Sequence, residues 1–262
     1  MSKVQDLFDM TGQAAIVTGG GTHLGTAMAE SLAELGASVV IASRRKEVCE
    51  QVAAKLRKNG LKVEAEGCDA TDEAQVAALI DGVVKKHGRL DAIVCNAGGS
   101  RPDANIPEAD VDAFWESVRM NILSTFVCAQ SAAKVMVKQG HGRIITLGSI
   151  HGGMGTDRRL YTPDHKRSSI GYFPAKGGVI NLTRAMASEL GEFGVTVNCI
   201  SPGQIPKPGV NPVLLENLRK RTPLFRLGIP EDLKGAVALL ASPAGAWITG
   251  QDLRVDGGWS VW

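Results

Sequence analysis

The stretch that decides the fold is Ala14-Ala15-Ile16-Val17-Thr18-Gly19-Gly20-Gly21-Thr22-His23-Leu24-Gly25. Residues 14–17 form a short apolar run, as expected for a parallel strand buried on both faces. The glycines that follow allow a tight turn, and residues 24–35 carry a helical pattern directly after it. A glycine turn between a strand and a helix lets backbone N–H groups approach a phosphate. The stretch therefore predicts a dinucleotide-binding turn, and the lack of a Gly-Lys-Ser/Thr sequence argues against a P-loop nucleotidase.

Short apolar runs and longer helical patterns alternate along the rest of the chain. The predicted strands are 14–17, 39–42, 62–66, 92–95, 143–147, 196–200 and 252–255. The predicted helices are 24–35, 46–58, 73–87, 110–138, 172–191 and 231–241. This alternation predicts an α/β fold, with a Rossmann-type doubly wound parallel sheet of about seven strands and helices on both faces. Because no repeat, low-complexity tract or linker marks a boundary, we expect one domain over residues 1–262.

Composition argues against several classes of partner. The chain has 29 basic and 27 acidic residues and a net charge of +2, which gives no electrostatic case for binding nucleic acid or a membrane. Its first residues lack the charged and apolar regions of a signal peptide. No apolar run reaches the length of about 20 residues that a membrane helix needs. We therefore expect a cytoplasmic protein with a small-molecule substrate.

The metal-ligating residue types are scattered. No Cys-x-x-Cys occurs, and the number of cysteines is odd: Cys49, Cys68, Cys95, Cys128 and Cys199. This pattern favours buried reduced thiols over disulfides or a zinc site. The histidines show no ligand spacing such as His-x-x-x-His, so we expect no metal.

A Tyr-x-x-x-Lys sequence at Tyr172 and Lys176 is the leading candidate for acid/base chemistry. Residues four apart lie on the same face of a helix, so the two side chains would point the same way. A lysine cation beside a phenol lowers the pKa of the phenol, which is otherwise near 10 and too high for efficient proton transfer at neutral pH. The pattern alone is weak evidence, because it also occurs by chance on solvated helices.

Several further motifs give the chain a resemblance to the short-chain dehydrogenase/reductase family. The glycine turn resembles its Thr-Gly-x-x-x-Gly-x-Gly motif, and Asn96-Ala97-Gly98 matches its Asn-Asn-Ala-Gly, with Cys95 in the first Asn place. The later signatures are matched by Pro202-Gly203 and by Val255-Asp256-Gly257-Gly258. The four residues in the family's catalytic order are Asn121, Ser149, Tyr172 and Lys176. The likeness covers nearly the whole chain.

The resemblance implies a role for each catalytic residue. Tyr172 would donate a proton to a carbonyl as hydride arrives, or remove one from an alcohol in reverse. Ser149 would hold the substrate oxygen, and Lys176 would bind the nicotinamide ribose and lower the pKa of Tyr172. Asn121 would anchor a water chain between Lys176 and solvent, although it could also be a polar group in the interior of a helix.

The end of the second predicted strand bears on the choice between NAD and NADP. NAD-preferring members of the family carry an acid there, whereas this chain reads Ala42-Ser43-Arg44-Arg45. Serine and arginine are suitable donors for a 2′-phosphate, so we favour NADP over NAD, although Arg45 could simply open a solvated helix. Asp69 would contact adenine, or cap a helix, or do both. The expected cofactor-binding residues are Gly19, Gly21, Thr22, His23, Leu24, Gly25, Ser43, Arg44, Arg45, Asp69, Ala70, Asn96, Ala97, Gly98, Tyr172, Lys176, Pro202 and Gly203.

Two departures from the family pattern matter. His23 replaces the penultimate glycine of the turn, where it could crowd the pyrophosphate, help to bind it, or simply be exposed. Ser149 and Tyr172 lie 23 positions apart, which is wider than the family usually has. Tyr161 is an alternative catalytic tyrosine, but His165 rather than a lysine stands four residues after it, so Tyr172 is preferred.

Two irregular stretches follow strands at the edge where ligands bind in such sheets. Residues 151–170 form a predicted substrate loop and residues 201–230 a predicted substrate lid; the alternative is that both are dispensable surface insertions. The loop is rich in basic residues, so an anionic or polyhydroxylated substrate is one interpretation and a solvated loop face the other. The expected substrate-binding residues are Ser149, His151, Arg158 and Gln204.

The opening and closing segments resemble gluconate 5-dehydrogenase-like members of the family, which implies a sugar acid, keto-uronate or polyol as substrate. Reduction of a 3-oxoacyl thioester on an acyl-carrier protein is the alternative. The low aromatic content of 5% argues mildly against a wide steroid pocket. From another class, the chain could be a catalytically silent NADP-binding sensor or scaffold. The closing Trp259-Ser260-Val261-Trp262 suggests an exposed subunit contact, and the family resemblance implies a homotetramer.

Overall fold

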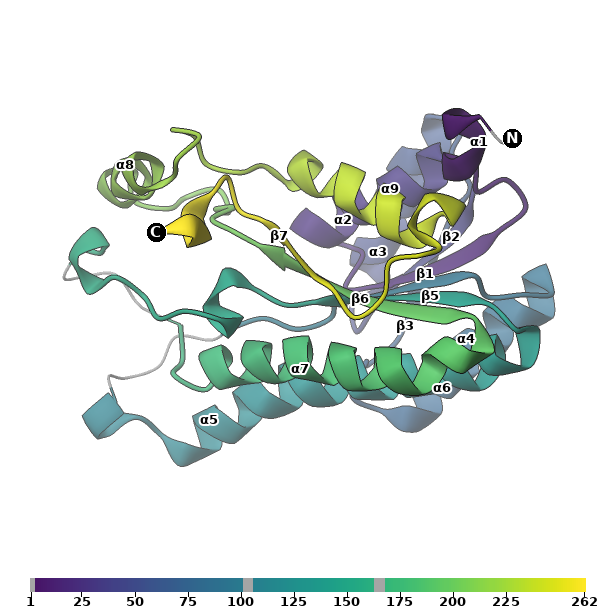
Figure 1. The fold of residues 1–262 in the computed structure, drawn as a ribbon, viewed down its shortest axis with the longest axis horizontal. Helices are drawn as coiled ribbons and strands as arrows, with labels where there is room; N and C mark the ends of the chain where they lie inside the picture. The colour runs from purple at the N-terminus through teal and green to yellow at the C-terminus, as the bar shows by residue number, and fades with distance from the viewer. Residues whose placement is uncertain (1–2, 101–105, 163–167) are drawn as a thin grey trace.

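The computed structural model describes residues 3–100, 106–162 and 168–262. Its centre is a seven-stranded parallel sheet with the order β3-β2-β1-β4-β5-β6-β7 (Figure 1). The strands are β1 Ala14–Thr18, β2 Ser38–Ser43, β3 Val63–Gly67, β4 Ala92–Cys95, β5 Gly142–Leu147, β6 Val195–Pro202 and β7 Asp252–Val255. Every predicted strand is confirmed: β1, β4, β5 and β6 are almost wholly buried apolar runs, whereas the edge strands β3 and β7 are partly exposed.

Helices cover both faces of the sheet (Figure 1). One hydrophobic core packs α2 (His23–Glu34), α3 (Lys46–Lys58) and α9 (Lys234–Ala241) against one face. A second core packs α4 (Glu73–His87), α6 (Ser124–Gln139) and α7 (Tyr172–Leu190) against the other. The predicted single-domain, doubly wound α/β fold is therefore confirmed. The strand order reverses between β1 and β4, and such a switch point opens a crevice for a ligand at the carboxyl ends of the strands.

The predicted helix over 110–138 is interrupted. α5 (Val111–Val118) passes into a π-helical turn at Arg119–Leu123 before α6 begins. The side chain of Asn121 donates to the main-chain oxygen of Ser117 at 2.8 Å within this turn. π-turns are frequent at functional sites. The 29-residue helical stretch Val111–Gln139 is long and apolar enough to span a membrane by length and composition, but its inner face packs on the sheet as a core helix does.

Two helices were not predicted. The short α1 (Val4–Phe8) precedes β1, and α8 (Pro212–Arg221) lies within the predicted lid. Pro212 stands in the first turn of α8, where its missing N–H costs nothing, and the side chain of Asn211 caps the helix by accepting from the N–H of Val213. The sequence predicts an irregular stretch here, but Pro212 begins a helix.

The described residues of the predicted loop over 151–170 are irregular apart from two 3₁₀ turns, Ile150–Gly152 and Arg158–Leu160. Its basic and acidic residues at 164–167 lie outside the described residues. All five cysteines are buried free thiols, as expected. Within the described ranges, no group of three or more His, Cys, Asp or Glu side chains could hold a metal ion.

Candidate active site

The glycine turn is held against the end of β4. The side-chain amide of Asn96 donates to the main-chain oxygens of Thr18 and Gly19, at 3.0 and 3.1 Å, and the hydroxyl of Thr18 accepts from the N–H of Ala97 at 3.1 Å. Gly19 has a φ of +65°, and a Cβ on Gly25 would lie 2.2 Å from the Gly19 carbonyl oxygen. Only glycines therefore fit these two places, and the turn is open for the backbone approach that a pyrophosphate needs.

His23 has a left-handed backbone conformation, which glycine adopts without strain. Its φ is +46°, in the left-handed region that disfavours side chains. Its buried Nδ1 has no hydrogen-bond partner among the described residues. Burial lowers the pKa of the imidazole, the nearby cation of Lys207 lowers it further, and Glu231 opposes both effects. His23 and Lys207 together line the cleft beside the turn. The position of Lys207 in this cleft could not be predicted from the sequence.

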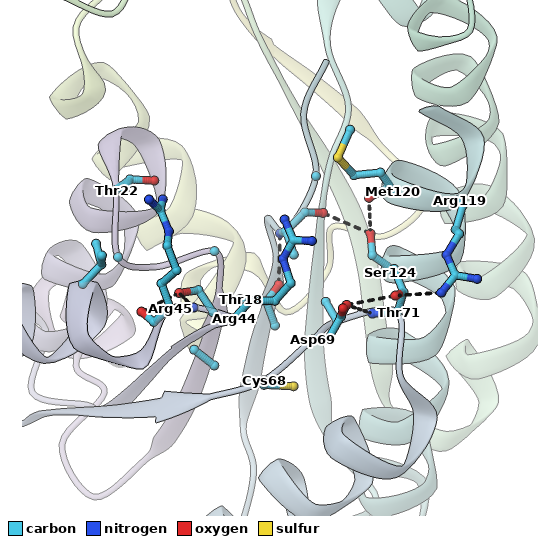
Figure 2. Close-up of a pocket in the computed structure, with 18 of the residues that line it drawn as sticks. Thr18, Thr22, Arg44, Arg45, Cys68, Asp69, Thr71, Arg119, Met120 and Ser124 are labelled. Atoms are coloured by element: carbon cyan, nitrogen blue, oxygen red, sulfur yellow. Dashed lines mark hydrogen bonds between the residues drawn. The ribbon is translucent and has the colours of Figure 1, made fainter. Parts of the chain in front are cut away.

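A first cleft of about 360 Å³ lies over the carboxyl ends of β1, β2 and β3 (Figure 2). Thr22, Arg44 and Arg45 line it, and β2 ends in Ser43 rather than an acid. The hydroxyl of Ser43 forms hydrogen bonds with the backbone of Arg45 and with the thiol of Cys49, the latter at 3.2 Å. Two arginines at the end of β2 fit the 2′-phosphate of NADP.

Asp69 follows β3 on the opposite wall of this cleft (Figure 2). Its carboxylate accepts from the N–H and the hydroxyl of Thr71, both at 2.9 Å, and the N–H bond is the main cause that lowers the pKa of Asp69. The cap of α4 is Asp72, not Asp69, so the alternative that Asp69 caps the helix is wrong. Arg119, from the π-turn, lines the same wall and lies 3.5 Å from the Thr71 hydroxyl. No local pattern in the sequence points to Arg119, because residues 119 and 71 meet only in the fold.

A second cleft of about 350 Å³ continues from the glycine turn to Ser149, Tyr172 and Lys176. Among its described lining residues there is no aspartate or glutamate, whereas His23, Lys176 and Lys207 are cationic or can become so. Every residue predicted to bind the dinucleotide lines one of the two clefts. The residues present therefore fit a dinucleotide: a glycine cradle, cationic walls and arginines at one end.

The hydroxyls of Ser149 and Tyr172 meet at the start of α7. Tyr172 is the first residue of this helix and forms a hydrogen bond with Ser149, which follows β5. Burial raises the pKa of Tyr172, and the bond with Ser149 acts in the opposite direction. Tyr161 instead packs in a small apolar cluster with Ile150, so the preference for Tyr172 agrees with the geometry.

Lys176 lies one turn further along α7. Its Nζ is 5.7 Å from the centre of the Tyr172 ring and donates to the main-chain oxygen of Leu147 at 2.7 Å. Burial lowers the pKa of Lys176 to about 8. The expectation that Lys176 sets the pKa of Tyr172 below its usual value is not met in this structure, because burial dominates at both groups.

Asn121 is buried behind the clefts rather than lining them. Its amide nitrogen donates to the oxygens of Gly99 and Ser117, both at 2.8 Å, and its amide oxygen accepts from the N–H of Gly99 at 3.1 Å. The side chain therefore fixes the loop after β4 to the π-turn. Its predicted part in a water chain stays a prediction.

A cavity of about 1190 Å³ adjoins the second cleft and shares Ser149, Tyr172, Gly203 and Ile205 with it. Both irregular stretches line this cavity, and all four predicted substrate-binding residues are among the lining. Most of the other lining side chains are apolar: Ile106, Ile150, Met154, Ile170, Phe173, Val210, Leu214 and Leu218.

Two of the predicted polar residues of the cavity differ in character. The ring of His151 lies 5.0 Å from that of Phe173 and 6.5 Å from that of Tyr172, and its Nδ1 has no hydrogen-bond partner in the described parts of the chain. Burial lowers the pKa of His151, which favours a neutral imidazole. Arg158 is exposed. The cavity thus offers a neutral hydrogen-bonding group near Tyr172 and a solvated cation elsewhere in its lining.

The chain is similar to known proteins over most of its length. A family model described as Enoyl-(Acyl carrier protein) reductase matches residues 19–260. The chain is 36% identical to cis-4-hydroxycyclohexanecarboxylate dehydrogenase of Sinomonas cyclohexanicum, over 95% of this chain and 97% of that protein. It is 34% identical to a 3-oxoacyl-[acyl-carrier-protein] reductase of Synechocystis, over 95% and 97% of the two chains.

Among solved structures, a gluconate 5-dehydrogenase of Burkholderia cenocepacia in complex with NADP and tartrate superimposes with a TM-score of 0.90. It is 31% identical, and the match covers 99% of this chain and 100% of that one. The family match begins in the glycine turn and ends at residue 260, and these relatives cover at least 95% of the chain. The chain belongs to the short-chain dehydrogenase/reductase family.

Proposed function

We propose that this protein is an NAD(P)-dependent oxidoreductase that transfers a hydride between a nicotinamide and a carbonyl or secondary alcohol. One observation carries the proposal: Ser149 and Tyr172 line both the cleft that begins at the glycine turn and the large cavity. A proton donor at that junction can reach a substrate in the cavity while a dinucleotide fills the clefts.

The side chains at the junction supply the proton chemistry. When bound, the nicotinamide provides the hydride in reduction and accepts it in oxidation. In reduction Tyr172 donates its hydroxyl proton to the carbonyl oxygen, and Ser149 donates a hydrogen bond to the same oxygen as negative charge develops there. In oxidation Tyr172 takes the proton of the alcohol instead. Lys176 would hold the nicotinamide ribose, and protons would return to Tyr172 from solvent.

NADP is the favoured cofactor. Arg44 and Arg45 at the end of β2, together with Thr22 of the glycine turn, are suited to a 2′-phosphate, and no acid stands at the end of β2 to bind a free ribose hydroxyl. The NADP complex of the gluconate 5-dehydrogenase from Burkholderia cenocepacia adds support from a relative.

Two substrate classes have support. A sugar acid, keto-uronate or polyol is supported by the likeness to gluconate 5-dehydrogenase and by the polar side chains of His151, Arg158 and Gln204. The mainly apolar lining favours a second candidate: a ketone or secondary alcohol on an apolar body, with an acidic group that Arg158 can meet. The relative that acts on cis-4-hydroxycyclohexanecarboxylate has a substrate of this second kind by its name. A 3-oxoacyl thioester would also place an apolar chain in the cavity.

A panel of substrates tests the proposal. Gluconate, a polyol, 4-oxocyclohexanecarboxylate and a 3-oxoacyl thioester are offered with each nicotinamide cofactor, and the absorbance of the reduced cofactor is followed. Turnover of at least one of them, and its loss in Tyr172→Phe, is the expected result. Cofactor binding without turnover of any carbonyl would instead support the silent sensor or scaffold.

We also propose a cytoplasmic homotetramer. The exposed apolar side chains of Trp115 and Phe126 on α5 and α6, and of Trp247 after α9, support assembly. Of the two closing tryptophans, only Trp262 is exposed, at 65%. Trp259 is only 5% exposed and packs within its own chain, so the expectation that Trp259 is exposed is wrong.

A further inference from the structure

The last residue of the lid helix lies between two tryptophans. The guanidinium carbon of Arg221 is 5.3 Å from the ring centre of Trp259 and 5.3 Å from that of Trp262. Arg221 donates from Nη2 to the main-chain oxygen of Trp262 at 2.9 Å, and the indole N–H of Trp262 donates back to the main-chain oxygen of Arg221 at 3.3 Å. Two cation–π contacts and a reciprocal pair of hydrogen bonds therefore tie the closing residues to the end of α8. We call Arg221, Trp259 and Trp262 the tryptophan clamp.

The helix that the clamp holds forms a wall of the substrate cavity. Leu214 and Leu218 of α8 are 2% and 4% exposed, and both line the cavity. They pack with Trp259 and with Ile150, the residue directly after Ser149, in an apolar cluster of their own, apart from the two cores on the sheet. Figure 1 shows α8 and the closing turn at the same end of the molecule.

The same helix also holds the substrate loop. The side-chain amide of Asn217 donates to the main-chain oxygen of Leu160 at 2.9 Å, and Leu160 packs against the small cluster. The position of α8 therefore fixes two cavity walls, one from the lid and one from the loop. No strand or sheet helix contributes a described residue to this cluster. The clamp is therefore one of a small number of connections that hold α8, together with the cluster, the Asn217 bond and the N–H of Leu224, which donates to the main-chain oxygen of Gly257 at 3.2 Å.

We propose that the tryptophan clamp is a positioning device that holds α8 over the cavity and thereby sets how tightly the body of the substrate is bound. Its residues touch neither the reacting hydroxyls nor the nucleotide clefts. The clamp is expected to affect KM for the substrate and to leave cofactor affinity unchanged. The kinetic part of this inference rests on the proposed function, whereas the placement of α8 does not.

Trp262 is the residue to vary, with size-exclusion chromatography to show that the variant assembles as the wild type does. It is 65% exposed, so its removal opens no core, whereas Trp259 is buried in the small cluster. Val261 beside it is 76% exposed and has no part in the clamp, which makes Val261→Ala the matched control. Trp262→Phe keeps an aromatic face for Arg221 but lacks the indole N–H. It should therefore loosen α8 less than Trp262→Ala does.

Hydrogen–deuterium exchange of the full-length protein tests the placement of α8 without any substrate. In Trp262→Ala, peptides covering 212–221 should exchange at least about tenfold faster, while those of α4 stay unchanged. In the NADPH-dependent reduction of 4-oxocyclohexanecarboxylate, the same variant should raise KM by about tenfold, the loss expected for one cation–π contact with its hydrogen bond, and change kcat little.

Trp262→Phe should lie between Trp262→Ala and the wild type, and Val261→Ala should match the wild type. Unchanged exchange of 212–221 in Trp262→Ala, or an equal increase in Val261→Ala, would overturn the proposal. If the ketone is not reduced by the wild type, the exchange result still decides on the clamp. If Tyr172→Phe retains full turnover, the proposed mechanism fails but the clamp does not.

Discussion

At the scale of single residues, the acid/base site depends on burial more than on the pairing of Tyr172 with Lys176. Burial raises the pKa of the phenol and lowers that of the ammonium to about 8. The two shifts have one cause, because a low-dielectric site disfavours the charged form of either group. Tyr172 is thus kept as a phenol, which suits proton donation in the direction of carbonyl reduction.

The lowered pKa of Lys176 predicts a pH profile. Lys176 carries its charge below a pH of about 8 and loses it above, whereas Tyr172 keeps its proton through this range because its pKa is raised. We therefore expect kcat/KM for ketone reduction to decline as the pH rises through about 8, with the loss of the lysine charge as the first alkaline event. A profile that stays flat until the pH approaches 10 would contradict this assignment.

The strained backbone of His23 predicts opposite effects on stability and binding. His23→Gly relieves a left-handed conformation that costs a side chain about 1 kcal/mol, although glycine also adds freedom to the unfolded chain. We expect the free energy of unfolding in urea to stay level or rise by up to about 1 kcal/mol. Cofactor affinity should fall, because the cleft loses an imidazole that can form a hydrogen bond with the pyrophosphate. Tighter cofactor binding in the variant would show that the imidazole crowds the site instead.

Arg44 provides the test of cofactor choice. Arg44→Ala should weaken NADPH binding by about tenfold to a hundredfold, the value of a charge-assisted hydrogen bond, and NADH binding much less. Arg184→Ala, an exposed arginine of α7 outside both clefts, is the matched control. Dissociation constants from fluorescence titration decide the matter. An equal loss for both cofactors would remove the 2′-phosphate assignment.

At the scale of elements, a buried carboxylate connects the N-terminal ends of neighbouring strands of the sheet. Asp91, 3% exposed before β4, accepts from the N–H of Ala14 at 2.8 Å, from Arg89 through both oxygens and from His141 at 2.9 Å. Burial raises the pKa of Asp91, but the bonds from Arg89, Ala14 and His141 together outweigh it and hold the pKa below its usual value. Asp91 therefore connects β1, β4 and the approach to β5.

The lowered pKa of Asp91 makes its contribution to stability dependent on acid. The contribution is fully present above the unfolded-state pKa of about 4 and is lost as the pH falls through the lower folded-state value. Asp91→Asn should reduce the free energy of unfolding by about 2 kcal/mol at neutral pH, and the difference from the wild type should shrink in acid. Urea unfolding at neutral pH and in acid measures this difference in the free energy of unfolding. Asp81→Asn, at an exposed position of α4, is the control. A difference that grows in acid would contradict the lowered pKa of Asp91.

The elements that the sequence could predict are those with a local signal. Apolar runs such as 14–17 mark strands because parallel strands are buried on both faces. α8 was missed because Pro212 looks like a breaker yet fits the first turn of a helix. The π-turn was missed because it depends on contacts of Asn121 with Ser117 and Gly99, and the second contact joins segments far apart in the sequence.

At the scale of the whole molecule, the two halves of the site differ in how far the sequence determines them. The cofactor half follows contiguous motifs, and every residue predicted for it lines a cleft. The substrate half is assembled from the lid, the loop and the closing turn, which meet in a small apolar cluster. Its mainly apolar lining could not be predicted, because the basic residues of the loop dominate its sequence while the apolar ones face the cavity.

The account depends most on Tyr172 as the proton donor where the cleft meets the cavity. The most direct measurement compares Tyr172→Phe with the wild type in turnover of the best substrate of the panel and in binding of NADPH, with circular dichroism to establish an intact fold. We predict that turnover falls by at least about a hundredfold, the contribution of a general acid, while the dissociation constant of NADPH is nearly unchanged. Turnover retained at the wild-type level would contradict the account.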